Sequence, residues 1–521
     1  MIRSTFAGFT MAQHALSASQ RAIDVAGQNL SNVNTAGYTR QRLDLASINP
    51  VGASYGSSSF DNKVGQGVMM KGIIQIRDPY LDIQYRNQIA KVGTADATDK
   101  ILEKIGNIFD ETDTAAIRTA LNDVISQLKN MAIPSESGER SSDALVRSAC
   151  TVLLNAIHQN ATSISNVISD TVDELQNSDI KNINSCLQQI VELNKTIKNT
   201  QVMGNPALEL LDQRNQLLDD LATYLPIQVT YETHGTGDSA VDTLKVTFKD
   251  KDGNVHNLIS DDKGGEFQLG TSAGSVPVSL KIKDALTPED PLDPTNINNI
   301  DIADLMQNGV LKGKIDMLNK SEVFDGSDIK GIGYYSSMFD KFVSTFATLM
   351  NDLNATVDGA GNTIPQDLFS TSDGSATFTA ENIKISDGWM DGTINLTRTQ
   401  TPGAGGTDNT SAYSNILKMV DELSNKEHDF TVFKGTLMAG FDNIQNTQAI
   451  ERKASSSILT NHLAVLNQIS DSKDAISGVN LDEEVMDLMR YQQSYNAASR
   501  LMTTLDQLLD KLINETGVVG R

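Results

Sequence analysis

Apolar residues recur at every seventh position at both ends of the chain. The N-terminal column comprises Ile2, Phe9, Leu16, Ile23 and Leu30. The C-terminal column comprises Leu481, Leu488, Tyr495, Met502 and Leu509. A second C-terminal column, three residues further on, includes Leu505 and Leu512. A seven-residue apolar repeat is typical of a coiled-coil helix, so the sequence predicts one long helix at each end.

The two terminal repeats are similar in length. At about 1.5 Å per residue, helices over residues 2–33 and 480–514 would each extend for roughly 50 Å. The residues three positions after the N-terminal column are mostly small, whereas the C-terminal columns are bulkier and Glu484 interrupts the second of them. Small side chains facing bulky ones would allow the two helices to pair closely. Each helix could equally pack on a globular body of its own, because such repeats are common in helical domains.

The middle of the chain alternates between helical and β-type spacing. Helical periodicity dominates residues 78–225, whereas residues 40–76 are expected to form loops and short strands. Apolar and polar residues alternate beyond Pro226, with Asp250–Gly253 as the expected turn of a hairpin. We divide the chain into a terminal coiled-coil domain (1–66 and 476–521), a helical bundle (67–228 and 410–475), a β-rich insertion (229–300), a helical segment packing on the body (301–357) and a second β-rich insertion (358–409).

The expected fold class is mainly α with inserted β structure. Aromatic residues make up only 5 % of the chain, which suits an elongated helical molecule better than a large compact one. We therefore expect an elongated multidomain protein with paired terminal coiled-coil helices, a helical bundle body and β-rich central insertions.

The chain is strongly acidic. It contains 42 Lys and Arg residues against 66 Asp and Glu, which gives a formal net charge of −24 at pH 7. This charge repels phosphate and argues against nucleic acid and anionic membranes as partners. No apolar run approaches the roughly 18 residues of a membrane span. The first ten residues also lack the apolar core of a secretory signal, so any secretion is expected to proceed without a cleaved signal peptide.

The sequence offers no pattern typical of catalysis or metal binding. Cys150 and Cys186 are too few for a disulfide framework and are expected to be buried free thiols. The six histidines are dispersed, and Asp250–Gly253 lacks carboxylates where a calcium loop requires them. Gly309–Lys314 is one residue short of a phosphate-binding loop. We predict no catalytic, cofactor or metal site and a protein that is not an enzyme.

Two runs of residues resemble the ends of bacterial flagellar rod, hook and hook-associated proteins. The first run extends from Asn29 to Tyr38 and the second from Gly478 to Glu484, with a continuation over residues 490–498. The residues that carry the resemblance are Asn29, Asn32, Asn34, Gly37, Tyr38, Arg40, Gln41, Asn480, Leu481, Asp482 and Glu483.

Three further features are similar to the hook-associated protein 1 family in particular. Thr39-Arg-Gln41 directly follows the tyrosine, Leu210-Leu-Asp-Gln-Arg-Asn-Gln-Leu-Leu218 is similar to an internal helix of that family, and the chain length is near its usual size. Ala36 departs from the pattern, because many relatives have proline there. The β-rich middle carries no motif of the family.

The resemblance implies a structural protein of the flagellum. Members of this family join the hook to the filament, between hook protein on one side and the second hook-associated protein on the other. The resemblance also implies export through the flagellar type III apparatus, a chaperone bound to the C-terminal segment, an extracellular location and a ring-like helical assembly of the chain with itself. Its terminal helices would form an inner coiled-coil tube.

The apolar columns at both ends are therefore the expected assembly seam. We expect the N-terminal column to pack against the C-terminal columns, within or between subunits, and the termini to order when the subunit docks on the hook. Two alternatives remain open. A rod or hook protein would share both terminal motifs, and a hydrolase acting on peptidoglycan would be an enzyme of flagellar construction.

Overall fold

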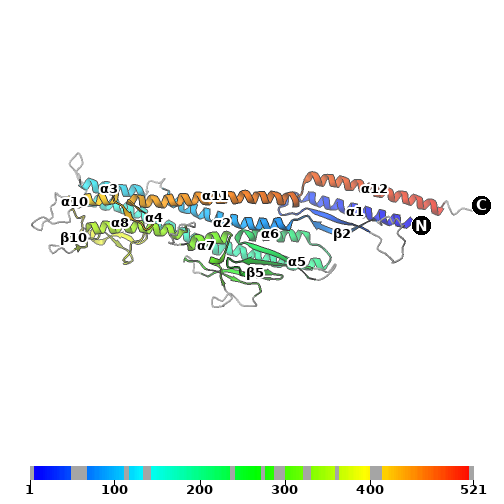
Figure 1. Cartoon of the computed structure of the whole chain (residues 1–521), viewed down its shortest axis with the longest axis horizontal. Helices are drawn as coiled ribbons and strands as arrows, with labels where there is room; N and C mark the ends of the chain where they lie inside the picture. The colour runs from blue at the N-terminus through cyan, green and yellow to red at the C-terminus, as the bar shows by residue number, and fades with distance from the viewer. Residues whose placement is uncertain are drawn as a thin grey trace, which may run out of the picture.

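The structure is a computed structural model that describes residues 5–48, 67–110, 117–132, 142–234, 241–270, 276–286, 300–320, 330–357, 363–398 and 413–514. Over these ranges the protein is elongated, with long helices parallel to its length and small sheets attached along one side (Figure 1). The chain is therefore built around helix pairs that join distant parts of the sequence.

The first and last helices form one end of the molecule. α1 (Thr5–Ser31) lies beside α12 (Leu481–Asn514) and packs on a hairpin of β1 (Gln41–Ser47) and β2 (Val68–Gln75) (Figure 1). We expected only loops and short strands over residues 40–76, and the hairpin is longer than that. Its pairing is completed by packing on α1, and local periodicity carries no information about that packing.

The helical body is centred on two antiparallel helices. α2 (Pro79–Phe109) lies along α11 (Leu437–Ser477), and Gln88 Nε2 donates to the His462 carbonyl at 2.9 Å. At the other end of the contact, Gln445 Nε2 donates to the Phe109 carbonyl at 2.6 Å. The remaining long helices of the body are α3 (Ile117–Ala132), α4 (Asp143–Glu174), α5 (Ile180–Val202), α6 (Leu208–Tyr224), α7 (Val310–Asn319), α8 (Ile332–Asn354) and α10 (Ser414–Ser424).

One turn of π-helix, Leu175–Asp179, joins α4 to α5. Gly309 precedes α7 with a φ of +109°, and its N–H donates to the Ala90 carbonyl at 3.0 Å. A β-carbon there would lie 2.1 Å from the Tyr224 carbonyl oxygen, so this glycine allows close packing of α2, α6 and α7. The segment Gly309–Lys314 therefore has a packing role.

An aromatic cluster joins α2, α8 and α11. Phe109 lies 5.8 Å from Phe339 and 6.2 Å from Phe441, measured between ring centroids. Phe342 lies 5.7 Å from Phe441, and all four side chains are buried. These residues come from three separate regions of the chain, so the cluster fixes the two halves of the body to each other.

Two antiparallel sheets pack on α5, on the side of the body that carries the bulge in Figure 1. The first sheet has the order β3–β4–β5–β6 and the second has the order β7–β8–β9. Their strands are β3 (Ile227–His234), β4 (Val241–Lys249), β5 (Val255–Ser260), β6 (Lys263–Gly264), β7 (Glu266–Leu269), β8 (Leu280–Lys283) and β9 (Ile300–Asp301).

The expected hairpin turn at Asp250–Gly253 is confirmed, because it connects β4 to β5. The Asp250 carboxylate accepts the Asn254 N–H at 2.8 Å and lies 3.2 Å from His256 Nε2. Burial alone would raise the pKa of Asp250, but the hydrogen bonds from Asn254 and His256 lower it to about 2. The carboxylate thus closes the turn.

Small elements cover the far end of the body, where Trp389 is buried against Phe369. They comprise a 3₁₀ turn (Ala303–Leu305) nearer the middle, α9 (Asp387–Asp391), β10 (Thr356–Val357), β11 (Thr363–Ile364), β12 (Phe369–Thr371), β13 (Ile383–Ile385), β14 (His428–Asp429) and β15 (Lys434–Gly435). The expected fold class, mainly α with inserted β structure and paired terminal helices, is confirmed.

The aromatic cluster predicts the effect of a core substitution. Phe342→Ala removes a fully buried ring, so the free energy of unfolding of the helical body should fall by about 3–5 kcal/mol. Urea denaturation followed by circular dichroism measures the change. Ile450→Ala on α11 is the control, because this side chain is 68 % exposed and its loss should cost less than about 0.5 kcal/mol. Equal effects of the two variants would contradict the assignment of the core.

Candidate assembly interface

α1 and α12 pair antiparallel with a constant register. Asn29 Nδ2 donates to Glu484 Oε2 at 3.0 Å near one end of the pair. Near the other end, a β-carbon at Gly8 would lie 3.3 Å from the Leu505 side chain. In each contact the two residue numbers add up to 513, as expected for an antiparallel pair without a shift. The register therefore holds over 21 residues of each helix, or three heptads. The structure pairs the two termini within one chain.

α12 turns most of its predicted seam toward α1. The contacts of Glu484 and Leu505 with α1 define this face. The other seam residues on it are half-buried at spacings of seven, and Ala498 is buried among them. They are Leu488, Tyr495, Met502 and Leu509.

Two predicted seam residues are largely exposed, and a third cannot be placed. Leu481 is 50 % exposed and Leu512 is 56 % exposed, so neither belongs to the contact with α1 in this chain. By the same register, Leu481 would face position 32, just beyond the end of α1 at Ser31, and Leu512 would face position 1. Ile2 lies outside the described residues.

Most of the buried apolar residues of α1 are alanines, and none of them belongs to the predicted large column. Ala12, Ala22 and Ala26 are buried, as the antiparallel contact of two closely spaced helices requires. The predicted large column is only half-buried along the edge of the contact, and its described members are Phe9, Leu16, Ile23 and Leu30. Helix geometry explains why the large column lies at the edge. Residues three and four positions apart share one face of a helix, and the large column lies beside the face that the alanines form.

Asn29 is the centre of a hydrogen-bond cluster at the base of the helix pair. Its Nδ2 donates to the Gln41 carbonyl at 2.9 Å and to Glu484 Oε2 at 3.0 Å. Its Oδ1 accepts the Tyr38 hydroxyl at 2.9 Å and the Gln41 N–H at 3.0 Å. Burial, reinforced by nearby carboxylates, raises the pKa of Tyr38 and keeps its hydroxyl a donor. A single buried amide therefore ties α1, β1 and α12 together.

Arg40, which directly precedes β1, completes this cluster. Its guanidinium lies 2.6 Å from Glu484 and 2.8 Å from Glu483. The backbone N–H of Arg40 donates to the Ser477 carbonyl at 2.9 Å. In the sequence, Glu484 is predicted only as an interruption of an apolar column. The structure corrects this, because Glu484 is buried and its carboxylate is held by Asn29 and Arg40.

The other motif residues shape the two turns at this base. Asn32 accepts the Thr35 hydroxyl at 3.1 Å, and Asn34 is exposed. Gly37 has a φ of +77°, and a β-carbon there would lie 3.2 Å from the Gln216 side-chain oxygen. The positive φ therefore favours glycine, and the Gln216 side chain of α6 leaves little space for a larger residue.

Asn480 caps the start of α12. Its Oδ1 accepts the Asp482 N–H at 3.0 Å and the Glu483 N–H at 3.4 Å, which satisfies donors that the helix itself leaves free. The acidic residues of the first turn favour the same helix end through its dipole. The motif Gly478–Glu484 is thus a helix start signal whose last residue is buried in the Asn29 cluster.

A second cluster fixes the terminal helices to the body. The Thr39 N–H and hydroxyl donate to the two Asp212 carboxylate oxygens at 3.0 and 2.6 Å. Asp212 belongs to the family-like segment 210–218, which lies in α6. The Thr39-Arg-Gln41 extension and the internal helix therefore form one structural unit, because each supplies half of this contact.

Five charged side chains continue from this contact into the body as a network of alternating sign. Arg77 pairs with Asp82, and Lys473 Nζ lies 3.3 Å from Asp82 and 2.8 Å from Asp219. Arg86 Nε lies 2.6 Å from Asp219. The network joins α2, α6 and α11 where the terminal helices leave the body, and we call this region the neck.

The carboxyl groups of the neck differ in pKa. Burial alone would raise the pKa of Asp82, but Arg77 and Lys473 lower it overall. Burial raises the pKa of Asp212, and the hydrogen bonds from Thr39 offset this only in part. The ionised Asp82 carboxylate therefore stabilises the neck at pH values above the ordinary aspartate pKa. This contribution is lost as the pH falls through the lowered pKa of Asp82.

Sequence reasoning missed the neck, although one signal was available. In α6 the buried positions Leu208, Asp212, Asn215 and Leu218 recur at helical spacing, so two polar residues occupy positions of an apolar stripe. Buried polar residues at such positions require partners. The partners come from residues far away in sequence, which no local pattern identifies.

The described residues contain no group of three or more His, Cys, Asp or Glu side chains arranged to hold a metal ion. Among the same residues, no helix has both the length and the apolar character needed to cross a membrane.

Three family models match successive parts of the chain. The model of the flagellar hook-associated protein FlgK helical domain matches residues 102–369. The model of the flagella basal body rod protein matches residues 9–39, and that of the flagellar basal body rod FlgEFG protein C-terminal part matches residues 475–515. The rod-type matches coincide with the Asn29 cluster and the two helices that it joins.

Similar proteins extend over nearly the whole chain. Flagellar hook-associated protein 1 from Bacillus subtilis strain 168 is 28 % identical over 99 % of this chain and 100 % of its own length. The Escherichia coli K12 protein of the same name is 24 % identical over 96 % of this chain and 98 % of its own length. The flagellar hook junction protein FlgK from Burkholderia pseudomallei has a similar fold, with a TM-score of 0.56 and 12 % identity over 76 % of this chain and 100 % of its own. Since the helical-domain model covers more than half of the 521 residues, the chain belongs to the flagellar hook-associated protein family that carries the FlgK helical domain.

Proposed function

We propose that this protein is a structural adaptor that joins the flagellar hook to the filament and is required for filament assembly. The proposal is supported by the family of the chain and by relatives named as hook-associated or hook junction proteins. The observation that carries it is the incomplete burial of α12. Of its 34 residues only Glu484 and Ala498 are buried, so its apolar surface is available for neighbouring subunits.

We also propose how the chain is exported to the junction of hook and filament. The chain would pass unfolded through the flagellar type III apparatus, with a chaperone on its C-terminal segment, and act outside the cell. Both cysteines are free, so no disulfide opposes unfolding before export. Its assembled partners would be further copies of itself, hook protein and the second hook-associated protein.

We propose a separate place in the assembly for each domain inferred from the sequence. The terminal domain (1–66 and 476–521) would form the inner tube, with the helical bundle (67–228 and 410–475) around it. The β-rich insertions (229–300 and 358–409) and the helical segment 301–357 would lie outside the tube. Support comes from the neck, where charged contacts fix the direction of α1 and α12 relative to the bundle.

A rod or hook protein is the second candidate. The rod-type family models at both ends favour it, because such ends are shared among axial proteins of the flagellum. The helical domain between them favours the junction protein.

Deletion of the gene separates these two functions. We expect electron microscopy to show complete hooks without filaments and an assay of the medium to show lost flagellin, because filament subunits would have no adaptor to assemble on. Truncated or missing hooks would assign the protein to the rod or hook. Intact filaments would contradict the proposed function.

The proposed seam predicts the effect of a charge in α12. Leu488→Asp and Leu505→Asp each place a carboxylate in the contact with α1, so incorporation into flagella should be lost while the body stays folded. Incorporation is measured by immunoblotting of purified flagella, and folding by circular dichroism of the purified chain. Gln493→Asp is the matched control, because Gln493 is exposed on the same helix. Normal incorporation of both leucine variants would refute the seam.

Ordering on assembly predicts a pattern of amide exchange. In the purified monomer, residues 5–33 and 480–514 should exchange faster than α2 and α11, because α12 buries little apolar surface within one chain. In purified flagella the same amides should be protected. Hydrogen–deuterium exchange with mass spectrometry measures both states. Strong protection of both terminal segments in the monomer would show that ordering on assembly is wrong.

Two variants sharpen this measurement. Asn29→Ala removes the four hydrogen bonds of the central amide, so exchange across α12 in the monomer should rise by about tenfold or more. Asn32→Ala is the control, because Asn32 bonds only within its own turn. It should leave exchange in α12 unchanged.

A further inference from the structure

The π turn between α4 and α5 is in contact with a charged side chain of α7. The Ile180 N–H donates to the Leu175 carbonyl five residues earlier, which is the hydrogen bond of a π-helix. Lys314 Nζ lies 3.1 Å from the Glu174 carboxylate and 2.7 Å from the Asp179 carboxylate. Asp179 is buried, and in the described part of the chain Lys314 is the one cation that pairs with it. A single ammonium group therefore bridges the turn.

This bridge fits a π turn better than an α-helical turn. Glu174 and Asp179 are five residues apart, and at 3.6 residues per turn their side chains would point about 140° apart around an α-helix. The hydrogen bonds of a π turn close a wider turn, which brings residues five apart toward the same side of the helix. Because one cation reaches both carboxylates, the contact with Lys314 stabilises the π turn relative to a regular helix.

α7 also contacts the sheets. Asn319, its last residue, accepts the Val278 N–H at 2.6 Å and donates to the Val278 carbonyl at 2.8 Å. Val278 lies two residues before β8. The start of α7 is fixed to α2, because the preceding Gly309 donates to the Ala90 carbonyl. α7 thus extends from the helical body to the sheets with Lys314 between its two ends, and we call it the strap.

The π turn separates two sets of contacts. Before the turn, α4 packs on α3 and α8 at the far end of the body. After the turn, α5 carries both sheets. Asn184 Nδ2 donates to the Phe267 carbonyl at 2.9 Å, its Oδ1 accepts the Phe267 N–H at 2.9 Å, and Asn194 Nδ2 donates to the Asp261 carbonyl at 3.0 Å. A change of angle at the turn would therefore move the sheets relative to the far end of the body.

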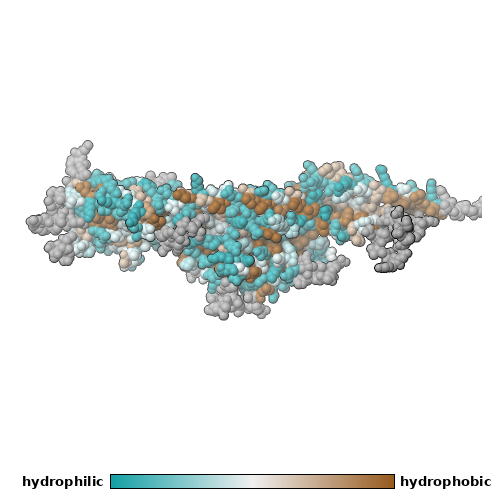
Figure 2. Space-filling model, viewed as in Figure 1, coloured by the Kyte–Doolittle hydropathy of each residue, from teal (hydrophilic) through white to brown (hydrophobic). Residues whose placement is uncertain are grey.

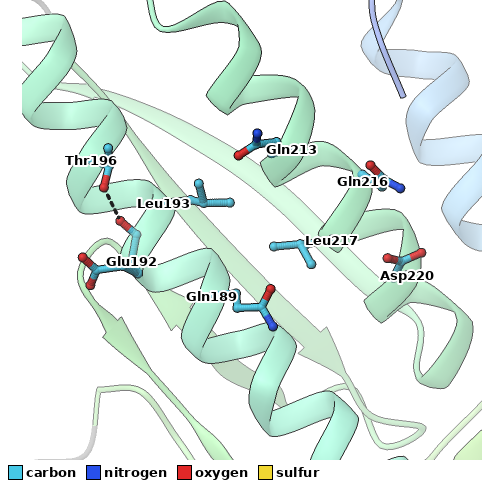
Figure 3. A pocket seen from close by; sticks show the side chains of 8 residues that line it. All are labelled: Gln189, Glu192, Leu193, Thr196, Gln213, Gln216, Leu217 and Asp220. Carbon is cyan, nitrogen blue, oxygen red and sulfur yellow. Dashed lines mark hydrogen bonds between the residues drawn. The ribbon is translucent and has the colours of Figure 1, made fainter. Parts of the chain in front are cut away.

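Two surfaces beside α5 are open to solvent. A groove of about 520 Å³ lies between α5 and α6, and Leu193 and Leu217 point into it (Figure 3). Its sides carry the carboxylates of Glu192 and Asp220. Figure 2 shows a largely hydrophilic surface where the two sheets bulge from the body. These solvated surfaces give α5 and its sheets room to change their orientation.

We propose that the π turn is a hinge in the long α4–α5 helix and that Lys314 of the strap locks it. π turns are among the few places at which a helix bends sharply. In the locked state, α5 and its sheets keep one orientation relative to α4. Without Lys314, Asp179 is a buried charge with no counter-ion, and the turn loses the contact that favours it. The hinge belongs to the single chain, so it is independent of the partners that the chain has in the flagellum.

Hydrogen–deuterium exchange of the purified full chain tests the lock. In Lys314→Met, amides of residues 171–184 should exchange faster by about tenfold or more, because the buried Asp179 loses its partner, while α3 stays unchanged. Lys312→Met is the matched control. The two lysines lie on the same helix, with side chains 13 % and 19 % exposed, but Lys312 pairs with Asp316 of its own helix. Equal exchange in Lys314→Met and the control would overturn the lock.

Deletion of one residue tests the π turn itself. Asn177 is exposed in the turn, and its deletion should leave a regular α-helical turn with α4 and α5 still facing their partners, because a π turn holds one residue more. Exchange over residues 171–184 should then be slower than in the wild type. Deletion of Gln188, exposed within α5, is the control, since it would rotate Asn194 away from Asp261 and expose the sheets. Equal damage to the sheets by both deletions would overturn the assignment of the turn as the hinge.

A distance measurement tests the movement. Spin labels on Gln159→Cys of α4 and Asp252→Cys of the β4–β5 turn, both exposed, are combined with Cys186→Ser, and their separation is measured by double electron–electron resonance. The distance distribution should be narrow in the otherwise unchanged chain and with Lys312→Met, and broader with Lys314→Met. Addition of Asn319→Ala should broaden it further, because the strap then loses its contact with Val278. A distribution that stays narrow with both Lys314→Met and Asn319→Ala would overturn the hinge.

Discussion

The rest of the structure depends on the buried amide of Asn29. Its four hydrogen bonds join α1, β1 and α12, and through Glu484 it meets the guanidinium of Arg40. A buried polar group of this kind is costly unless every partner is present, so the cluster forms only when both chain ends are correctly placed. The pairing of the termini is therefore specified by hydrogen bonds at one point, while alanines and half-buried apolar residues extend it.

The neck converts this local pairing into a defined overall shape. Thr39 binds Asp212 on α6, and Lys473 joins α11 to carboxylates of α2 and α6. Ion pairs with excellent geometry contribute direction and specificity more reliably than stability, because desolvation offsets much of their attraction. The proposed assembly, in which the molecule repeats in one orientation, would need this specificity. The large apolar cores lie elsewhere, in the aromatic cluster of α2, α8 and α11.

The candidate site was predictable in part. The heptads identified both terminal helices and most of the α12 face, and the Asn–Gly–Tyr motif identified the base of the pair. Glu484, Asp212 and Lys473 were missed, because each acts through a partner more than 100 residues away. The long β1–β2 hairpin was underestimated for the same reason, since its packing surface is supplied by α1.

The sequence by itself determined the long terminal helices, the helical body, the β-rich insertions and the family to which the chain belongs. These properties depend on local periodicity and on short motifs, which are read along the chain. Only the tertiary structure decided the antiparallel register of α1 and α12, the burial of small rather than large residues on α1, and the charge network of the neck. Register and ion pairing depend on which surfaces meet in space, and heptad spacing constrains the face of a helix but not its partner or its direction.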